Sequence, residues 1–346
     1  MDSMEKISNK GNLMDVSIIV PCRNEENYIG KCLDSIIAQD YPGESLGVLV
    51  VDGMSEDGTR DIIRSYTQEH SFIRLLDNPK KITPCALNTG IKNAKGEIIL
   101  WMSAHNRYEK DYISKCIKYL KEYNADNVGG IMATMPRNNI FLGRAIASVL
   151  SHPFGVGNSV FRIGAKEPKW VDTVFGGCYK REVFDKIGFF NENLARGQDM
   201  EFNLRLKKAG GKILLHPEIV SYYYARSDFK SFCKNNFRNG IWVILSFKYT
   251  KVMPVSLRHL IPFVFVLSIV VSGVLSFFSS AFFWLFLLIV GLYFLTNIYF
   301  SIKIALRKKN IKYLFIMPII FLSLHLGYGL GSIVGAIKLL LPVKEI

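Results

Sequence analysis

The stretch that decides the fold is VSIIVPCRNEENYIGKCLDSIIAQDYPGESLGVLVVDGMSEDGTRDIIRSY, residues 16–66. Two short runs of β-branched and other apolar residues, at 16–20 and 48–51, lie on either side of a segment whose apolar residues recur at helical spacing. Strands that are apolar on both faces are typical of a parallel sheet covered by helices on both sides. In such open α/β sheets, ligands bind beyond the carboxyl ends of the strands. The sequence therefore predicts an α/β domain whose binding edge is formed by the loops after these two strands.

Each of the two predicted strands is followed by a polar loop. The loops read Pro21-Cys22-Arg23-Asn24-Glu25 and Asp52-Gly53-Met54-Ser55-Glu56-Asp57-Gly58-Thr59. They resemble the opening of the family 2 glycosyltransferases, in which the first strand is followed by Pro-x-x-Asn-Glu and the second by Asp-Gly-Ser-x-Asp-Gly-Thr. Met54 departs from that pattern, because a small residue is more usual there. The resemblance implies an inverting enzyme with a GT-A fold and a mostly parallel sheet, and it places Pro21, Arg23 and Glu25 at the binding site of a nucleotide-sugar donor.

Asp52 ends the second predicted strand and has two interpretations. As a donor residue, its carboxylate accepts a hydrogen bond from the ring N–H that distinguishes a uracil or a guanine. As a structural residue, it stands in a turn, and Ser55 and Asp57 cap a helix expected over residues 59–70. Asp57 fits the capping role better than a binding role.

The next predicted unit is a strand at residues 72–76, a helix at 85–94 entered through Pro84, and a strand at 98–102. Its loop at residues 78–81 and its helix resemble the segments that lie beside the donor in the family. This resemblance places Asn88 at the donor, and it makes Lys81, or its neighbour Lys80, a candidate contact to the diphosphate. A charged pair in a loop is alternatively a solvated surface feature.

The family usually carries Asp-x-Asp after this third strand, and the carboxylates bind a divalent cation that bridges the two phosphates of the donor. Here the positions read Ser103-Ala104-His105. A branch similar to the succinoglycan-type exopolysaccharide transferases has Asp-x-His, so Ser103 is the larger departure. Imidazole nitrogen ligates Mn²⁺, whereas Mg²⁺ strongly favours oxygen. The resemblance therefore implies Ser103 and His105 at the donor, with His105 as a ligand of Mn²⁺ rather than Mg²⁺; a hydrogen-bonding residue at a strand end is the alternative for His105.

Residues 175–192 resemble the acceptor-side strand and loop of the family. Gly176 and Gly177 permit a ligand to approach the backbone closely, or they form a plain turn. Gln198 and Asp199 stand where the family has Glu-Asp at a helix N-terminus. The resemblance assigns Asp199 as the catalytic base and Gln198 to the acceptor side, and a helix cap is the alternative for Asp199. Because Gln198 is uncharged, like-charge repulsion that raises the pKa of such a base is weakened.

Composition indicates an enzyme joined to a membrane. The chain has 346 residues, of which 49% are hydrophobic, and the apolar residues are concentrated late. No charge occurs within residues 260–278, 281–302 or 313–337, and each run reaches roughly the 20 residues of a transmembrane helix. Buried core helices are the alternative, but three such runs in succession favour spans. The sequence therefore predicts a glycosyltransferase domain at residues 1–250 and a membrane domain at 258–341.

The charged residues around these runs predict the orientation of the chain. Basic residues precede the first run and crowd the connection between the second and third, whereas the Ser279-Ser280 connection is uncharged; they are Lys248, Lys251, Arg258, Lys303, Arg307, Lys308, Lys309 and Lys312. Basic loops face the cytoplasm. We expect a multi-pass protein of the cell membrane with residues 1–250 in the cytoplasm and Lys344-Glu345-Ile346 outside. The first dozen residues are polar and charged, so no cleavable signal peptide is expected.

The net charge of +14 does not indicate nucleic-acid binding, because the basic residues form no stripe interleaved with stacking aromatic residues. A cytoplasmic surface against anionic lipid explains the excess better. The six cysteines include no Cys-x-x-Cys pair, so neither a zinc site nor a disulfide framework is indicated. We expect them to be reduced and mostly buried.

Two later segments also resemble the exopolysaccharide branch. In residues 223–227 and 237–242, Arg226 and Arg238 are candidate diphosphate contacts, because a guanidinium matches phosphate geometry and stays charged. Anchoring at the membrane interface is an equal alternative. In residues 325–332, small side chains permit close approach of helices, and His325 is a functional candidate without an assigned role because ionisable residues inside membranes are costly.

The implied reaction is transfer of one sugar from a nucleotide sugar, with UDP as the expected nucleotide, to a lipid-linked saccharide in exopolysaccharide or cell-surface glycan synthesis. Further proteins of polysaccharide assembly are expected partners. Because the metal-binding carboxylates and one acidic residue of Glu-Asp are replaced, a non-catalytic scaffold that binds nucleotide sugars or lipid-linked glycans is an alternative. A processive polymerase is a weaker one, since three spans are few and the Gln-x-x-Arg-Trp motif of such enzymes is missing.

Overall fold

The computed structural model describes residues 15–250 and 255–341. The chain divides into two compact units, the first from residues up to Met132 together with Gly164–Tyr223, and the second from Ala133–Ile163 together with residues from Tyr224 onward. The predicted division into 1–250 and 258–341 stays a prediction, and the compact units divide the chain elsewhere. Sidedness or a leader was predicted for the first dozen residues, for Lys251 and for the segment 344–346. These positions lie outside the described residues.

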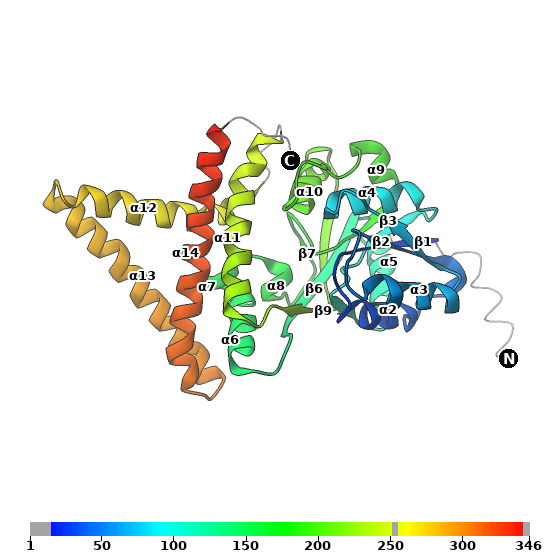
Figure 1. The fold of residues 1–346 in the computed structure, drawn as a ribbon, viewed down its shortest axis with the longest axis horizontal. Coiled ribbons are helices and arrows are strands. Elements are labelled where there is room, and N and C mark those ends of the chain that lie inside the picture. The colour runs from blue at the N-terminus through cyan, green and yellow to red at the C-terminus, as the bar shows by residue number, and fades with distance from the viewer. Residues whose placement is uncertain (1–14, 251–254, 342–346) are drawn as a thin grey trace. The chain divides into compact units, whose positions relative to one another are not determined.

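A nine-stranded sheet forms the centre of the first unit within the described residues (Figure 1). The strand order is β3-β2-β1-β4-β8-β6-β9-β5, and β7 pairs with β9. β3, β2, β1 and β4 are parallel, and β8 joins β4 in the antiparallel sense. The strands are β1 (Val16–Cys22), β2 (Leu46–Asp52), β3 (Ile73–Asp77), β4 (Ile98–Trp101), β5 (Asn106–Tyr108), β6 (Asn127–Pro136), β7 (Lys169–Trp170), β8 (Cys178–Lys180) and β9 (Ile213–Ala225).

The helices of the first unit cover both faces of the parallel strands. Ile18 and Val50 belong to a buried cluster that includes Leu33 of α2, whereas Ile19 points the other way and lies so close to α4 that a Cβ on Gly90 would come within 2.5 Å of it. Side chains alternate between the faces of a strand, so both faces of β1 are buried. The helices are α2 (Ile29–Ile37), η2 (Gly43–Ser45), α3 (Thr59–Glu69), α4 (Thr83–Asn93), α5 (Tyr112–Glu122), α9 (Glu182–Ile187) and α10 (Gln198–Lys208).

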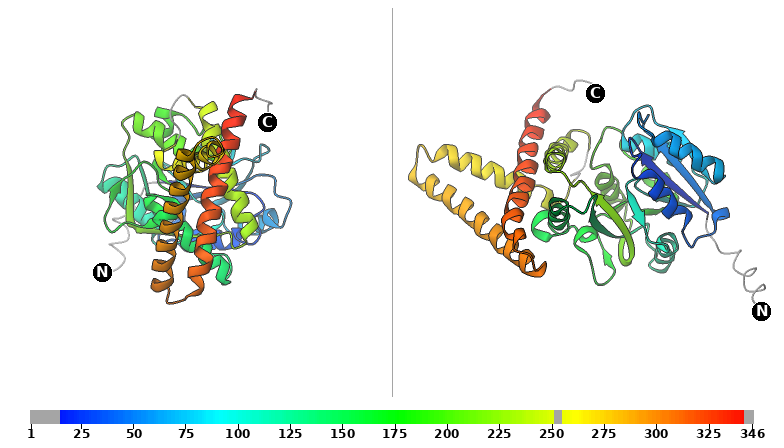
Figure 2. Two further views of the ribbon diagram at one scale, coloured as in Figure 1. Left: turned by 90° about the vertical axis from the view of Figure 1, so that its left-hand side faces the viewer. Right: turned by 60° about the horizontal axis from the view of Figure 1, so that its bottom comes forward.

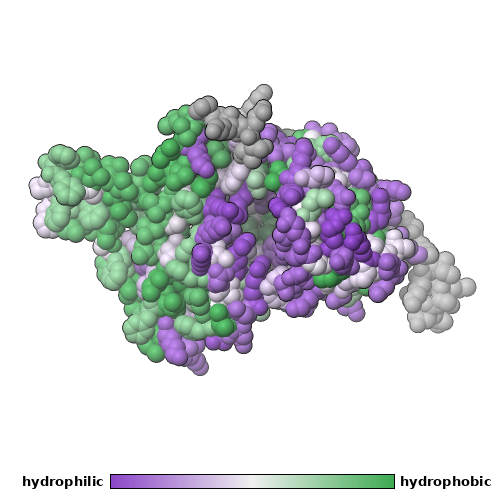
Figure 3. Space-filling view, in the orientation of Figure 1, coloured by the Kyte–Doolittle hydropathy of each residue, from purple (hydrophilic) through white to green (hydrophobic). Residues whose placement is uncertain are grey.

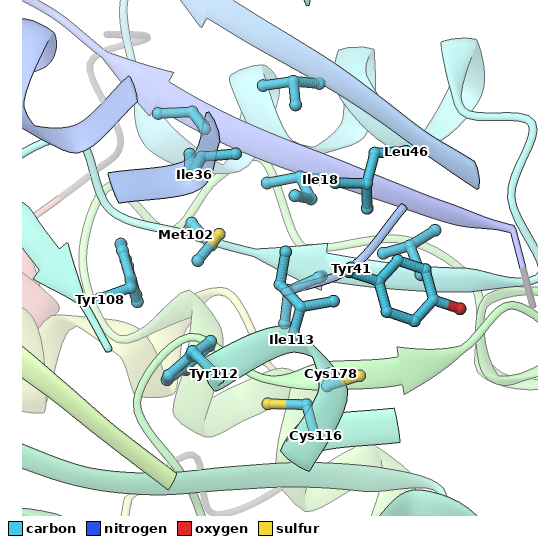
Figure 4. Packing of buried hydrophobic residues seen from close by; sticks show 14 of the residues in the cluster. Ile18, Ile36, Tyr41, Leu46, Met102, Tyr108, Tyr112, Ile113, Cys116 and Cys178 are labelled. Atoms are coloured by element: carbon cyan, nitrogen blue, oxygen red, sulfur yellow. The ribbon is translucent and has the colours of Figure 1, made fainter. Parts of the chain in front are cut away.

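The core of this unit brings together β1, α2 and α5. Figure 4 shows Ile18, Ile36 and Ile113 in one packed layer. All three are fully buried. The predicted strands at 16–20, 48–51, 72–76 and 98–102 and the helices between them are confirmed, with ends shifted by one or two residues. Five of the six cysteines are buried and Cys233 is partly buried, as expected.

The second unit is helical and contains three helices long and apolar enough to cross a membrane, at Leu257–Leu275, Ser280–Arg307 and Lys312–Leu340. This confirms the three predicted apolar helices. Figure 2 shows that α13 returns from α12 as a hairpin, and Figure 3 shows hydrophobic residues gathered over these helices. The helices are α6 (Phe141–Leu150), α7 (Pro153–Val156), α8 (Val160–Ile163), α11 (Phe229–Leu245), η3 (Ser246–Lys248), η4 (Leu257–His259), α12 (Ile261–Leu275), α13 (Ser280–Arg307) and α14 (Lys312–Leu340).

Small residues hold α14 against α11. A Cβ on Gly331 would come within 2.1 Å of the Phe237 carbonyl oxygen, and one on Gly240 within 2.0 Å of the Tyr328 carbonyl oxygen. The Ser332 hydroxyl donates a hydrogen bond of 3.2 Å to the Gly240 carbonyl. Backbone contact of this kind requires glycine at the crossing, so the close helix approach predicted from residues 325–332 is confirmed.

Substituting Gly331 by Ala should destabilise the protein, because the added methyl group meets backbone and overpacking costs about 1–3 kcal/mol. Gly291→Ala in α13 is the matched control, since no atom lies within 4 Å of a Cβ placed there. We expect thermal unfolding of the full chain in detergent to show a lower midpoint for Gly331→Ala only. Equal midpoints for the two variants would contradict the α11–α14 contact.

Candidate active site

The loops after β1 and β2 are tied to each other by hydrogen bonds. The Asn24 N–H donates to Ser55 Oγ at 2.8 Å, and the Glu56 N–H donates to Asn24 Oδ1 at 3.0 Å. The Glu25 N–H donates to Thr59 Oγ1 at 2.7 Å. These bonds fix the polar edge that the sequence predicts beyond the carboxyl ends of the two strands. Pro21 lies within β1, and Arg23 next to this edge is exposed.

Asp52 is completely buried at the end of β2. Oδ2 accepts hydrogen bonds from the Ser55 N–H at 2.9 Å and from Arg60 Nη1 at 2.7 Å. Oδ1 accepts from Ser55 Oγ, and the Cys22 thiol lies 3.7 Å away. Burial, reinforced by the Asp52 charge, raises the pKa of the Cys22 thiol, so the thiol stays protonated. A carboxylate offers about four acceptor positions, and protein donors face all four here.

Arg60 is a site residue that the sequence analysis missed. Its guanidinium joins Asp52 to Asp77 at the end of β3, with Nη2 of Arg60 2.8 Å from Asp77 Oδ1. A fully buried carboxylate requires a counter-charge. The sequence signal for Arg60 is that it is a cation in the first turn of the helix that follows Asp52. Recognition of the base by Asp52 stays a prediction, and it requires that a base N–H take the place of one of the present donors.

The positions after β4 place Ser103 and His105 beside the loop after β1. His105 Nδ1 lies 3.2 Å from Glu25 Oε1, and the side chains of His105 and Glu25 are 30% and 19% exposed. The His105 ring also meets the edge of Tyr223, with centroids 5.4 Å apart. Ser103 Oγ is 3.4 Å from Nε2 of the same ring, and the Ser103 N–H donates to the Tyr108 hydroxyl. His105 is therefore paired with a carboxylate from another loop.

The residues at this edge fit a divalent cation that binds mainly through its substrate. Within the described residues, no group of three or more His, Cys, Asp and Glu side chains gathers as a metal site. Glu25 and His105 nevertheless present one oxygen and one nitrogen close together and partly open to solvent. Cations that act on nucleotides commonly use one or two protein ligands and complete their shell with phosphate oxygens and water. An imidazole ligand favours Mn²⁺ over Mg²⁺.

Asn88 and Lys80 hold the segment that follows α9. The Asn88 amide accepts from the Phe190 N–H at 3.0 Å and donates to Glu192 Oε1 at 3.0 Å, while Lys80 Nζ lies 2.6 Å from Glu192 Oε2. The hydrogen bonds from Lys80 and Asn88 lower the pKa of Glu192 to about 2. Lys81 instead points to Glu56, 3.9 Å away. Of the two lysines, Lys81 is thus the one directed to the loop after β2, and its contact to a diphosphate stays a prediction.

Gly176 and Gly177 have positive φ angles of 72° and 118°. A Cβ on Gly176 would lie 2.7 Å from the Trp101 carbonyl oxygen, and one on Gly177 would lie 2.6 Å from the Tyr179 ring. Backbone conformation and packing therefore require glycine here without any ligand. Their predicted contact with an acceptor stays a prediction.

Asp199 lies in the first turn of α10, and Gly197 rather than Asp199 is the residue that precedes this helix as its N-cap. Burial, followed by the charge of Asp199, raises the pKa of Tyr179, whose ring lies 2.6 Å from where a Cβ on Gly177 would be. Gln198 is buried. Glu201, in the same turn, is paired with Arg205 at 2.6 Å and so has a structural role. The role of Asp199 as the catalytic base stays a prediction.

Arg226, Arg238 and His325 belong to the second unit. Both arginines are exposed, and their contact with a diphosphate stays a prediction. His325 Nε2 lies 2.9 Å from the Phe154 carbonyl oxygen, and Nδ1 lies 2.9 Å from the Tyr293 hydroxyl. His325 therefore links α7, α13 and α14. Sequence reasoning could not find this role, because Phe154 is 171 positions away.

The comparisons with known proteins agree with this arrangement. The family model described as Glycosyl transferase family 2 matches residues 17–188. A glycosyltransferase of Methanococcus voltae, named dolichyl N-acetyl-alpha-D-glucosaminyl phosphate 3-beta-D-2,3-diacetamido-2,3-dideoxy-beta-D-glucuronosyltransferase, is 32% identical over 93% of this chain and 97% of its own length. This chain belongs to glycosyltransferase family 2. The resemblance stated from the two loops and the expectation of an enzyme are thereby confirmed.

Two further similar proteins extend the comparison. The succinoglycan biosynthesis protein ExoA of Rhizobium meliloti (strain 1021) is 26% identical over 91% of this chain and 92% of its own length. The solved structure of the mannosyltransferase PcManGT from Pyrobaculum calidifontis, in complex with GDP-Man and Mn²⁺, has a TM-score of 0.59 at 19% identity and covers 91% of this chain and 87% of that one. The second similarity supports the fold, and the predicted GT-A-like α/β domain followed by long apolar helices is confirmed.

Arg60→Met should destabilise this family 2 glycosyltransferase, because the buried Asp52 charge loses its partner. Removing one partner of a buried ion pair costs about 3–5 kcal/mol. Arg64→Met is the matched control one turn later, since the Arg64–Asp61 pair is exposed and exposed pairs contribute about 0–1 kcal/mol. Chemical unfolding of the full chain in detergent measures both. The double variant Arg60→Met/Asp52→Asn should recover much of the loss; no loss in the single variant would refute the role of Arg60.

Proposed function

We propose that this glycosyltransferase moves one sugar from a nucleotide sugar, with UDP as the nucleotide, to a lipid-linked saccharide in the synthesis of an exopolysaccharide or another cell-surface glycan. The observation that carries the proposal is the presence, in one chain, of a GT-A-like domain and three helices long enough to cross a membrane. The Methanococcus voltae relative is named for action on a dolichyl-phosphate-linked sugar, and the Rhizobium meliloti relative for succinoglycan biosynthesis. The first name supports an acceptor anchored in lipid, and the second supports synthesis of a polysaccharide.

In this proposal the donor lies along the edge beyond β1, β2 and β4. Open α/β sheets bind ligands at this edge, and here its loops carry the polar side chains. Asp52 recognises the base, and Lys81, Arg226 and Arg238 meet the diphosphate. The remaining donor residues are Pro21, Arg23, Glu25, Asn88, Ser103 and His105. His105 would be a ligand of a bound Mn²⁺ ion, which would supply positive charge against the diphosphate.

Asp199 acts as the general base in this proposal. It takes the proton of the acceptor hydroxyl while that oxygen bonds to the anomeric carbon and the bond from this carbon to the diphosphate breaks, which inverts the configuration. Gly176, Gly177 and Gln198 line the acceptor side. Transfer of a proton to a positioned base contributes roughly 10²- to 10⁴-fold to a rate. Alignment of the two substrates supplies a further large part.

The distribution of charge supports a cytoplasmic catalytic domain in a multi-pass membrane protein. α13 ends at Arg307 and α14 begins at Lys312, so the basic residues occupy the α13–α14 connection, whereas Ser279 and Ser280 lie at the α12–α13 connection. Positive residues are retained on the cytoplasmic side. Nucleotide sugars are thus met in the cytoplasm, and further polysaccharide-assembly proteins are the proposed partners.

Turnover tests the proposed function. Membranes that contain the protein are incubated with a panel of UDP- and GDP-sugars and a lipid-diphosphate saccharide, and the lipid products are measured by mass spectrometry. Addition of a single sugar is the expected result. Products with many added sugars indicate a processive polymerase. Binding of nucleotide sugar without any product supports the non-catalytic scaffold instead.

Asp199→Asn should lower turnover by at least about a hundredfold, because an amide cannot accept the acceptor proton. Binding of the donor should be nearly unchanged. Asp185→Asn is the control, since Asp185 is an exposed carboxylate on α9, and it should keep normal turnover. If Asp199→Asn retains more than about a tenth of the rate at saturating acceptor, the base is another residue.

Labelling of introduced cysteines should establish the orientation of the membrane helices. A membrane-impermeant thiol reagent added outside intact cells should reach Ser280→Cys and not Asn310→Cys, because the basic connection faces the cytoplasm. The unmodified chain already carries six cysteines, so its labelling provides the background signal. The opposite labelling pattern would place the catalytic domain outside, away from nucleotide sugars, and would overturn the proposed function as well.

A further inference from the structure

Glu25 and His105 come from two different loops and meet at the sheet edge. β1 and β4 are neighbouring parallel strands, with Val16 opposite Ile98 in register, so the loops that leave their carboxyl ends lie side by side. Glu25 follows the first strand and His105 the second. Glu25 Oε1 and His105 Nδ1 are 3.2 Å apart, although 80 positions separate the two residues.

We infer that Glu25 supplies the carboxylate that Ser103 cannot, so that Glu25 and His105 together hold a divalent cation on the donor diphosphate. This inference rests on the proposed function. Two neighbouring ligands of an octahedral ion at about 2.1 Å lie about 3.0 Å apart. The observed separation of 3.2 Å is close to that value. This 3.2 Å contact is itself a hydrogen bond or ion pair, and a cation that displaces it would contact both side chains.

The surroundings hold both groups ready for a ligand. The Glu25 N–H donates to Thr59 Oγ1 at 2.7 Å, and the Glu25 carbonyl accepts from the N–H groups of Tyr28 and Ile29. The backbone of Glu25 is thus fixed independently of its side chain. The His105 ring is held by its edge contact with Tyr223. Binding a cation then requires little ordering of the protein, which lowers the entropy cost of binding.

The charge at the site also fits this assignment. An Asp-x-Asp pair offers two carboxylates, whereas Glu25 and neutral His105 offer one carboxylate and one imidazole. The number of protein ligands is the same, and one negative charge fewer surrounds the ion. A set with one hard oxygen and one nitrogen suits Mn²⁺, which accepts imidazole more readily than Mg²⁺ does.

The experiment measures Mn²⁺ binding directly by electron paramagnetic resonance, with the full chain in detergent and either UDP or GDP present. Glu25→Gln keeps the backbone bonds of Glu25 and removes the charged ligand. It should weaken Mn²⁺ binding at least about tenfold, since even outer-shell partners are worth 10- to 100-fold in metal affinity. Glu26→Gln removes one charge from the same loop and should bind Mn²⁺ like the unmodified chain.

A rescue variant makes the test specific. If Glu25 stands in for the carboxylate missing at position 103, Glu25→Gln/Ser103→Asp should regain most of the Mn²⁺ affinity that Glu25→Gln loses. Equal Mn²⁺ affinity for Glu25→Gln and the unmodified chain would overturn the inference. So would absence of bound Mn²⁺ in the unmodified chain when UDP or GDP is bound. A loss of metal-free nucleotide binding in Glu25→Gln would assign Glu25 to the nucleotide and would overturn it too.

The measurement of Mn²⁺ binding and the test of the proposed function can fail independently of each other. Mn²⁺ binding is measured with the nucleoside diphosphate alone, without sugar or acceptor. A chain that binds Mn²⁺ through Glu25 but transfers no sugar would keep this inference and refute the proposed function. A chain that transfers sugar with unchanged Mn²⁺ binding in Glu25→Gln would do the reverse.

Discussion

The parallel alignment of β1 with β2 and β4 is the constraint on which the site depends. Parallel strands direct their carboxyl ends to one edge, so three polar loops from distant parts of the chain come together there. The alignment is fixed because both faces of β1 are buried, and a register shift by one residue would exchange the side chains of the two faces. Hydrogen bonds such as Asn24 to Ser55 then lock the loops to each other. The geometry of the edge thus follows from the burial of the strands beneath it.

The local parts of this fold could be predicted from the sequence and the long-range contacts could not. Residues 16–20 and 48–51 are continuous apolar runs, and the segment between them has helical periodicity, so each element is specified within a few residues. The Glu25–His105 contact depends on which strand lies next to β1, and no local pattern encodes strand order. The contact of His325 with the Phe154 carbonyl could not be predicted for a similar reason, because a backbone acceptor has no sequence signature.

The Asp52–Arg60 pair lies between these two cases. Only eight positions separate the residues. The motif predicted that Asp52 matters, and elementary electrostatics predicts that a fully buried carboxylate needs a cation. The missing step was the burial of Asp52, which only the packed sheet shows. For Gly176 and Gly177 the sequence offered a turn as the structural explanation. The structure adds a packing reason, since a Cβ at either position would collide with its neighbours.

The replacements at the site all remove negative charge. Relative to the family pattern, Ser103 and His105 replace two carboxylates, and Gln198 replaces a third. A donor diphosphate is anionic, so each carboxylate near it repels it unless a cation lies between them. In the proposed donor site, fewer carboxylates leave less negative charge beside the diphosphate, and Glu25 with His105 is the proposed set of protein ligands for the cation. Gln198 likewise removes the repulsion between adjacent acids that a Glu-Asp pair would have at this position.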